Sequence, residues 1–135
     1  MKKAFLLNSA ITETIAKMGH TDSLVIGDAG LPIPDGVKRI DLAVSEGIPG
    51  FMEVLKAVLS EQKVEKIILA EEIKTASPQM HEDILDACKS VEAHLEVEYV
   101  SHEMFKKTTE KSKAVVRTGE FTPYANVILV SGVVF

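Results

Sequence analysis

Apolar residues along this chain alternate between two spacings, and this alternation limits the possible folds more than any other feature. In some segments they recur every three or four positions, as on one face of a helix, and in others they form short runs, as in a strand. Helical spacing covers residues 7–18, 49–59, 77–91 and 101–111. Strand-like runs cover residues 23–28, 37–42, 67–70, 95–99, 114–117 and 126–130. Strands interleaved with helices predict an α/β fold, with a mixed β-sheet flanked by helices.

Polar residues and prolines mark the expected ends of the helices. Asn8 or Ser9 can cap the first helix, and Gly19 can follow its end in a left-handed conformation. Pro49 is expected as the first residue of the second helix. Ser77-Pro78 and Ser101 are typical starts of the next two. The side chains expected to face inward are Leu7, Ile11, Ile15, Met18, Phe51, Leu55, Val58, Leu59, Ile84, Leu85, Cys88 and Val91.

Length and composition favour one domain spanning residues 1–135. With 46% hydrophobic residues, the chain can bury roughly two-thirds of its unfolded surface without disulfides or metals. A net charge of −5 argues against nucleic acid as a partner, because nucleic-acid binding needs a basic face. The first apolar run, residues 4–7, is shorter than a signal peptide requires, and no run approaches a membrane span. The single Cys88 favours a reducing compartment, so we expect a cytoplasmic protein.

The last residues are unusually apolar for a chain end. Residues 132–135 read Gly-Val-Val-Phe, whereas chain ends are ordinarily polar and frayed. Two arrangements would cover them: a contact with another subunit, or an edge strand that extends a final hairpin of the chain's own sheet. The first arrangement is favoured and predicts a homo-oligomer.

Several kinds of chemistry have no support in the sequence. No G-x-G-x-x-G or phosphate-loop motif is present. The four histidines show no metal-ligand spacing, so we expect neither a metal nor a cofactor. His81 and His94 are interpreted as solvated residues near helix ends, and Cys88 as a core residue.

Polar residues at predicted element ends are the candidates for function. His20 follows a helix end, Asp28 follows an apolar strand, and residues 117–126 form a polar loop that contains Tyr124 and ends at Asn126. Ligands of α/β sheets gather beyond the carboxyl ends of strands, which favours Asp28. A capping histidine, an Asx turn and an ordinary connection are the plain structural alternatives. His102 and Lys106 lie one helical turn apart and can face the same way. Together these groups suit proton transfer on a small polyhydroxylated ligand.

Four of these stretches resemble one known family. They are Gly19-His20-Thr21-Asp22, the run Asp28 to Gly36, Tyr99 to Glu103, and Arg117 to Asn126. In this order and at these spacings the chain resembles the ribose pyranase/fucose mutarotase family over about residues 3–135. The stretch Gly30-Leu31-Pro32 and the segment before Tyr124 favour the ribose branch of the family.

The resemblance implies an isomerase that interconverts the pyranose and furanose forms of D-ribose in the cytoplasm, without a cofactor. It implies a ring-forming subunit that assembles into a homodecamer of two stacked pentamers, with sites at subunit interfaces. Carried over residue by residue, it makes His20 the proton donor. The residues implied to bind the sugar are Asp28, His102, Lys106, Tyr124 and Asn126.

Two other functions stay open on the sequence alone. One is a mutarotase acting on fucose or another aldose, and the other is a non-catalytic sugar-binding or regulatory protein of a transport system. The histidine and carboxylate favour catalysis, because binding alone is served by amides and aromatic rings. Asp28 is expected to bind sugar and to contribute to orienting His20.

Overall fold

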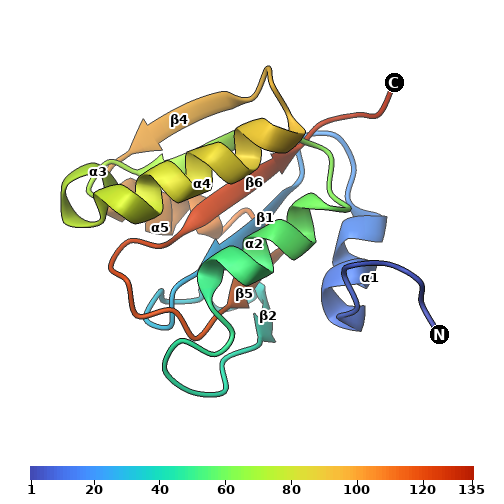
Figure 1. The fold of residues 1–135 in the computed structure, drawn as a ribbon, viewed down its shortest axis with the longest axis horizontal. Helices are drawn as coiled ribbons and strands as arrows, with labels where there is room; N and C mark the ends of the chain where they lie inside the picture. Colours follow the sequence, from blue (N-terminus) through green and yellow to red (C-terminus); the bar gives the residue numbers. More distant parts are fainter.

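One mixed sheet organises the chain, and its central strand runs against all the others. The computed structural model describes residues 1–135, in which the strands take the order β2-β5-β1-β6-β3-β4 (Figure 1). Their bounds are β1 Ser23–Gly27, β2 Lys38–Asp41, β3 Val64–Ala70, β4 Glu96–Val100, β5 Ala114–Arg117 and β6 Val127–Ser131. β6 pairs antiparallel with β1 and β3, and the remaining pairs are parallel. The carboxyl ends of five strands and the start of β6 therefore share one edge of the sheet, here called the carboxyl edge.

Helices cover both faces of this sheet. They are α1 Ser9–Lys17, α2 Phe51–Leu59, α3 Ile73–Ala76, α4 Pro78–Val91 and α5 His102–Thr109. In Figure 1, α2 and α4 cross in front of the sheet and α5 lies behind it. The larger core layer joins α1, α2 and α4 to the sheet, and a smaller layer surrounds Phe105 of α5 on the other face. None of the helices has the length and apolar character needed to cross a membrane.

Burial on both faces explains the unbroken apolar runs in the sequence. Leu24 and Ile26 of β1 enter the larger core layer, whereas Val25 between them enters the smaller one. All three are fully buried. Such a strand needs apolar residues at successive positions rather than at alternate ones. The predicted α/β class with a mixed, helix-flanked sheet is confirmed, and so are the six predicted strands.

Two of the predicted helix starts are confirmed by their capping hydrogen bonds. The Asn8 side chain accepts a hydrogen bond from the Ile11 N–H at 2.9 Å, at the start of α1. Ser101 Oγ accepts one from the Met104 N–H at 3.2 Å, at the start of α5. Each side chain satisfies an N–H that the first helical turn leaves without a partner.

Other boundaries differ from the sequence prediction. α2 begins at Phe51, so Pro49 lies outside it. The left-handed residue after α1 is Thr21, with φ 70°, and not Gly19. Leu7 and Val91 were expected to face inward but are 65% and 55% exposed. Leu7 precedes the first residue of α1 and Val91 is the last residue of α4, so each lies at the margin of the core. The short helix α3 was not predicted.

The apolar end of the chain forms no strand. Residues 132–135 lie beyond β6, and Val134 and Phe135 are 86% and 100% exposed. The predicted extension of a hairpin by residues 133–135 is therefore wrong. No other part of the chain covers the side chains of Val134 and Phe135.

Candidate functional site

Four of the predicted site residues meet at the carboxyl edge. Asp28 follows β1, His102 opens α5 directly after β4, and Tyr124 and Asn126 precede β6. They converge because the ends of the parallel strands and the start of the reversed strand β6 lie side by side. This is where ligands bind in open α/β sheets.

Asn126 holds Asp28 through both ends of its side-chain amide. Asn126 Oδ1 accepts a hydrogen bond from the Asp28 N–H at 2.8 Å, and Asn126 Nδ2 donates one to Asp28 Oδ2 at 3.1 Å. Asn126 is 1% exposed, so its side-chain amide is shielded from water. The other carboxylate oxygen, Oδ1, accepts from the Gly30 N–H at 2.9 Å. Asp28 is thus fixed by its neighbours and is not a mobile surface carboxylate.

Burial sets the ionisation of Asp28. Removal from water raises the pKa of its carboxyl above the ordinary value. Hydrogen bonds from Gly30, Asn126 and Leu31, and the charge that His102 can carry, oppose this rise without cancelling it. Asp28 consequently takes up a proton at a higher pH than an exposed aspartate does.

His102 and Tyr124 pack against each other beside this pair. Their ring centroids are 5.1 Å apart with an interplanar angle of 85°. Tyr124 has φ 61°, a backbone conformation that is uncommon for a residue with a bulky side chain and that is enriched at functional sites. Nδ1 of His102 is buried without a hydrogen-bond partner within the chain. A buried polar atom without a partner is rare in native proteins, and a role in catalysis or binding is one explanation of it.

A carboxylate that the sequence analysis missed anchors His102. Glu72, just before α3, accepts the His102 N–H with both oxygens, at 3.0 and 3.1 Å. It thereby adds a negative charge at the start of α5, where the helix dipole favours one. Its sequence context, Glu71-Glu72 after a buried strand, matches the context that made Asp28 a candidate.

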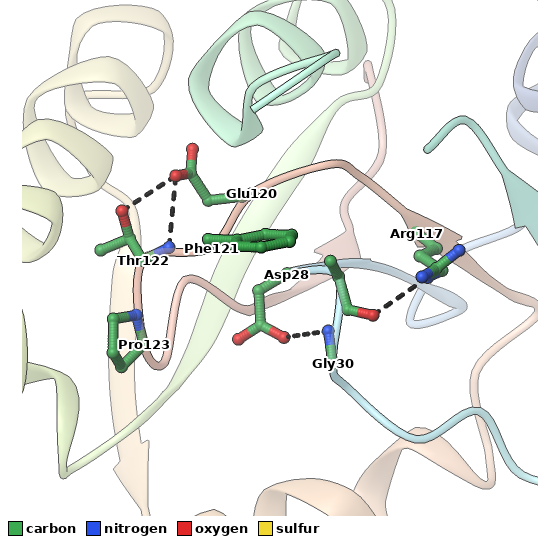
Figure 2. A pocket seen from close by; sticks show the side chains of 8 residues that line it. Asp28, Gly30, Arg117, Glu120, Phe121, Thr122 and Pro123 are labelled. Atoms are coloured by element: carbon green, nitrogen blue, oxygen red, sulfur yellow. Dashed lines mark hydrogen bonds between the residues drawn. The ribbon is translucent and has the colours of Figure 1, made fainter. Parts of the chain in front are cut away.

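A cavity of about 450 Å³ opens beside Asp28 (Figure 2). Its walls are the turn after β1 and the loop after β5, and the residues that line it are Asp28, Ala29, Gly30, Arg117, Glu120, Phe121, Thr122 and Pro123. Arg117 Nε donates to the Ala29 carbonyl at 3.0 Å, and the Ala29 N–H donates to the Glu120 carbonyl at 2.8 Å. These bonds tie the two walls together. The cavity is therefore a formed feature of the fold, and it brings solvent to Asp28.

The Glu120 carboxylate is held by hydrogen bonds within the fold. Burial alone would raise the pKa of its carboxyl, but hydrogen bonds from the Phe51 N–H and from Thr122 outweigh it and lower the pKa. The bond to Phe51 also joins the loop to the first residue of α2. Gly119 lets the loop approach residues 45–48, since a Cβ there would lie 2.5 Å from the Ser45 carbonyl oxygen. The polar loop predicted from the sequence thus forms a hydrogen-bonded wall of the cavity.

Lys106 lies one turn after His102 on α5, as predicted. Its Nζ is 2.7 Å from a carboxylate oxygen of Glu103 in the same helix. In this position the amine contacts none of the other predicted site residues.

His20 lies at the opposite edge of the sheet. It precedes β1, whereas Asp28 follows it, and five residues of strand span about 17 Å. The Thr21 N–H donates to the Ser131 carbonyl at the far end of β6, which places the turn beside the end of the chain. A second cavity, of about 490 Å³, is lined there by His20 and by residues 131–135, among others. Within one chain, His20 and Asp28 do not pair as the sequence analysis expected.

His81 is not simply solvated, which corrects its interpretation. Its Nε2 lies 2.6 Å from the Tyr99 hydroxyl, and Lys74 Nζ sits 3.7 Å from the centroid of the Tyr99 ring. Burial, followed by the charge of Lys74, lowers the pKa of His81. Cys88 is a core residue as predicted, and burial raises the pKa of its thiol to about 12. No three His, Cys, Asp or Glu side chains converge as metal ligands would.

Replacing Asn126 by alanine should destabilise the carboxyl edge in a pH-dependent manner. The change leaves the Asp28 N–H and carboxylate without these hydrogen-bond partners, which should lower the free energy of unfolding by about 1–3 kcal/mol near neutral pH. Because Asn126 lowers the pKa of Asp28, its loss raises that pKa further. A folded-state pKa above the unfolded value favours folding at low pH and loses that effect as pH rises, so the deficit should shrink on acidification.

Urea denaturation at several pH values measures this effect. Asn8→Ala is the matched control, because Asn8 caps α1 and touches no carboxylate. Its deficit should be the same at every pH. An Asn126→Ala deficit that is equally independent of pH would contradict the ionisation of Asp28 described above.

The sequence and the fold of this chain match those of a known protein family. The family model described as "RbsD / FucU transport protein family" matches residues 1–134. The "D-ribose pyranase" of Clostridium novyi is 56% identical over 135 residues, and that of Aliivibrio fischeri is 55% identical over 139, with both chains covered fully in each case. This chain belongs to the RbsD / FucU family.

Solved structures agree with this assignment. The Bacillus subtilis RbsD structure, described as complexed with D-ribose, superposes with a TM-score of 0.92 at 47% identity and full coverage of both chains. FucU of Bifidobacterium longum superposes with a TM-score of 0.84 at 25% identity over 96% of each chain. The ribose-associated relative is thus the more similar of the two in both sequence and structure.

Proposed function

We propose that this chain is an isomerase that interconverts the pyranose and furanose forms of D-ribose. The observation that carries the proposal is full-length identity of 56% to a protein named D-ribose pyranase. The relative whose structure is described as complexed with D-ribose supports it. The carboxyl edge supplies suitable groups: a fixed carboxylate, an unpartnered imidazole nitrogen and a phenol.

The reaction requires a proton to move at each of two oxygens. Opening the ring protonates the ring oxygen and deprotonates the anomeric hydroxyl, which gives the aldehyde and a free hydroxyl. Reclosure joins a different hydroxyl to the same carbonyl carbon and reverses the proton movements. A histidine suits both steps, because its charge changes between about pH 5 and 8. We assign this role to His20, following the family resemblance.

The remaining proposed site residues hold the sugar. Asp28 accepts hydrogen bonds from hydroxyls, while His102 Nδ1 and the Tyr124 hydroxyl offer further polar contacts. The Lys106 amine can also bind the sugar if it breaks its ion pair with Glu103 when the sugar enters the site. Asn126 acts chiefly through Asp28, because both ends of its amide are already bonded there.

The proposed site is completed by a second copy of the chain. His20 and Asp28 lie at opposite edges of the sheet, farther apart than a pentose can bridge. The exposed apolar end at the His20 edge supplies surface for a contact between copies. We therefore propose that the carboxyl edge of one chain meets the His20 edge of another, within the decamer of two pentameric rings that the family resemblance implies.

Mixing two inactive variants should restore activity. His20→Ala removes the proton donor and leaves the carboxyl edge intact, whereas Asp28→Ala does the reverse. If chains are mixed at random during co-refolding, about a quarter of the sites combine both intact halves. Exchange activity of the mixture should approach a quarter of that of the native protein. A mixture no more active than the sum of its two parts would contradict the shared site.

Saturation-transfer NMR on equilibrated D-ribose tests the function itself. The protein should cause exchange between the pyranose and furanose signals at catalytic concentrations. Exchange with fucose and not with ribose would indicate the mutarotase instead. Binding without exchange would indicate a sugar-binding or regulatory protein.

We place the reaction in the cytoplasm, as the resemblance implies. The buried, unpaired Cys88 is compatible with a reducing compartment. Fractionation of cells that produce the protein tests this placement.

A further inference from the structure

A bulge in β3 brings a carboxylate to His20. Val64 is opposite Ser131 and Lys66 is opposite Val130, so Glu65 is an extra residue in its strand. Bulges of this kind redirect side chains and are common beside active sites. The two carboxylate oxygens of Glu65 lie 3.0 and 3.1 Å from Nε2 of His20.

Both partners are held in place by the backbone around them. On the His20 side, the Gly19 N–H donates to Asp22 Oδ2 at 2.9 Å, and the Thr21 N–H donates to the Ser131 carbonyl at 2.9 Å. On the Glu65 side, a Cβ on Gly132 would lie 3.0 Å from Glu65 Cβ, so a larger residue at this position would crowd the Glu65 side chain. The contact therefore joins two segments whose positions the fold fixes.

The chemistry of the contact distinguishes the two ring nitrogens of His20. An ionised carboxylate can only accept hydrogen bonds, so Nε2 must carry the proton that lies between them. Nδ1 makes no hydrogen bond within the chain. In the neutral ring the free lone pair is consequently on Nδ1.

We propose that Glu65 is a positioning residue for His20, which keeps Nε2 protonated so that Nδ1 is the nitrogen that exchanges a proton with the sugar. This inference rests on the proposed function, because it assigns different roles to the two ring nitrogens of the proposed proton donor. In the ring-opening step, Nδ1 of the imidazolium gives its proton to the ring oxygen and later recovers one from a sugar hydroxyl. Glu65 accepts the Nε2–H hydrogen bond throughout and takes no part in the transfer to the sugar.

An ordinary surface ion pair is the alternative explanation of the same contact. The His20 and Glu65 side chains are 52% and 44% exposed, and exposed pairs contribute little to stability. A merely structural pair would leave the turnover rate unchanged once the protein is folded. The two explanations therefore differ in kcat and in the state of the ring.

Glu65 variants test the positioning role. Glu65→Ala should lower kcat for ribose exchange by about tenfold, while KM changes little. This loss is smaller than the roughly 10²–10⁴-fold loss typical of removing the acid–base group itself. Glu65→Gln keeps an acceptor oxygen and should recover most of the rate. Glu98→Gln is the matched control, because Glu98 is 43% exposed in a strand ion pair with Lys66, and it should exchange at the native rate.

The ring nitrogens can be observed directly. With ¹⁵N-labelled histidine, neutral His20 should be solely the Nε2-protonated tautomer in the native protein and should gain a measurable share of the other tautomer in Glu65→Ala. Replacing His20 by Nδ1-methylhistidine should abolish exchange, because the methyl group occupies the reacting nitrogen. Retained exchange in that protein, or an unchanged kcat and tautomer in Glu65→Ala, would overturn the inference. A native protein without ribose exchange would instead overturn the proposed function.

Discussion

Ribose exchange should fall by about 10²–10⁴-fold when His20 is replaced by alanine, while ribose still binds and the assembly persists. This is the usual contribution of a general acid–base group. Since histidine is the side chain whose charge changes between pH 5 and 8, the variant should also lose pH dependence in that range. Saturation-transfer NMR gives the rate, and titration of ribose into the protein followed by calorimetry gives the affinity.

A matched substitution separates this effect from a general loss of histidine. His94 is exposed in the turn before β4 and is not one of the proposed site residues, so His94→Ala should exchange at the native rate. Near-normal exchange with intact pH dependence in His20→Ala would refute its assignment. The proton donor would then be sought at His102, the other histidine at the proposed site.

Deleting residues 133–135 should break the assembly and abolish exchange. Val134 and Phe135 are almost wholly exposed within the chain, and apolar groups so uncovered lose contact with water when copies associate. Without them the proposed docking of the His20 edge should fail, and neither half of the proposed site should act alone. Analytical ultracentrifugation should show smaller species, and NMR should show no exchange.

Two comparisons make this deletion specific. Val134→Ser with Phe135→Ser keeps the chain length and should weaken the assembly in the same direction. Val91→Ser changes another exposed apolar residue, on α4, and should leave the assembly intact. A truncated protein that stays large and active would exclude the end of the chain from the contact.

The strands could be predicted from sequence because burial on both faces leaves a clear trace. Leu24, Val25 and Ile26 are apolar in succession since each face of β1 has its own core layer. The direction of a strand leaves no such trace. Val127 to Val130 reads alike whether β6 runs with its neighbours or against them, so the reversal of the central strand needed the structure.

The part of the proposed site at the carboxyl edge could be predicted from where its residues lie relative to the strands in the sequence. Asp28 and Asn126 flank strands on the side that shares the carboxyl edge, and both were identified. The separation of His20 from Asp28 was also implicit, because residues before and after one strand must lie at opposite edges. Glu65 was missed because its neighbours give an ordinary strand pattern, and a bulge depends on pairing with β6 rather than on local sequence.

The reversed strand β6 has one more consequence for an assembly of this chain. It begins beside Asp28 and ends beside His20, so the two proposed half-sites, which are unlike, lie on opposite sides of every chain. An open row of such chains always leaves one half of each kind unmatched at its ends. A closed arrangement leaves none, and the number of working sites then equals the number of chains. Closure of the assembly would thus be required for full catalytic capacity and not only for stability.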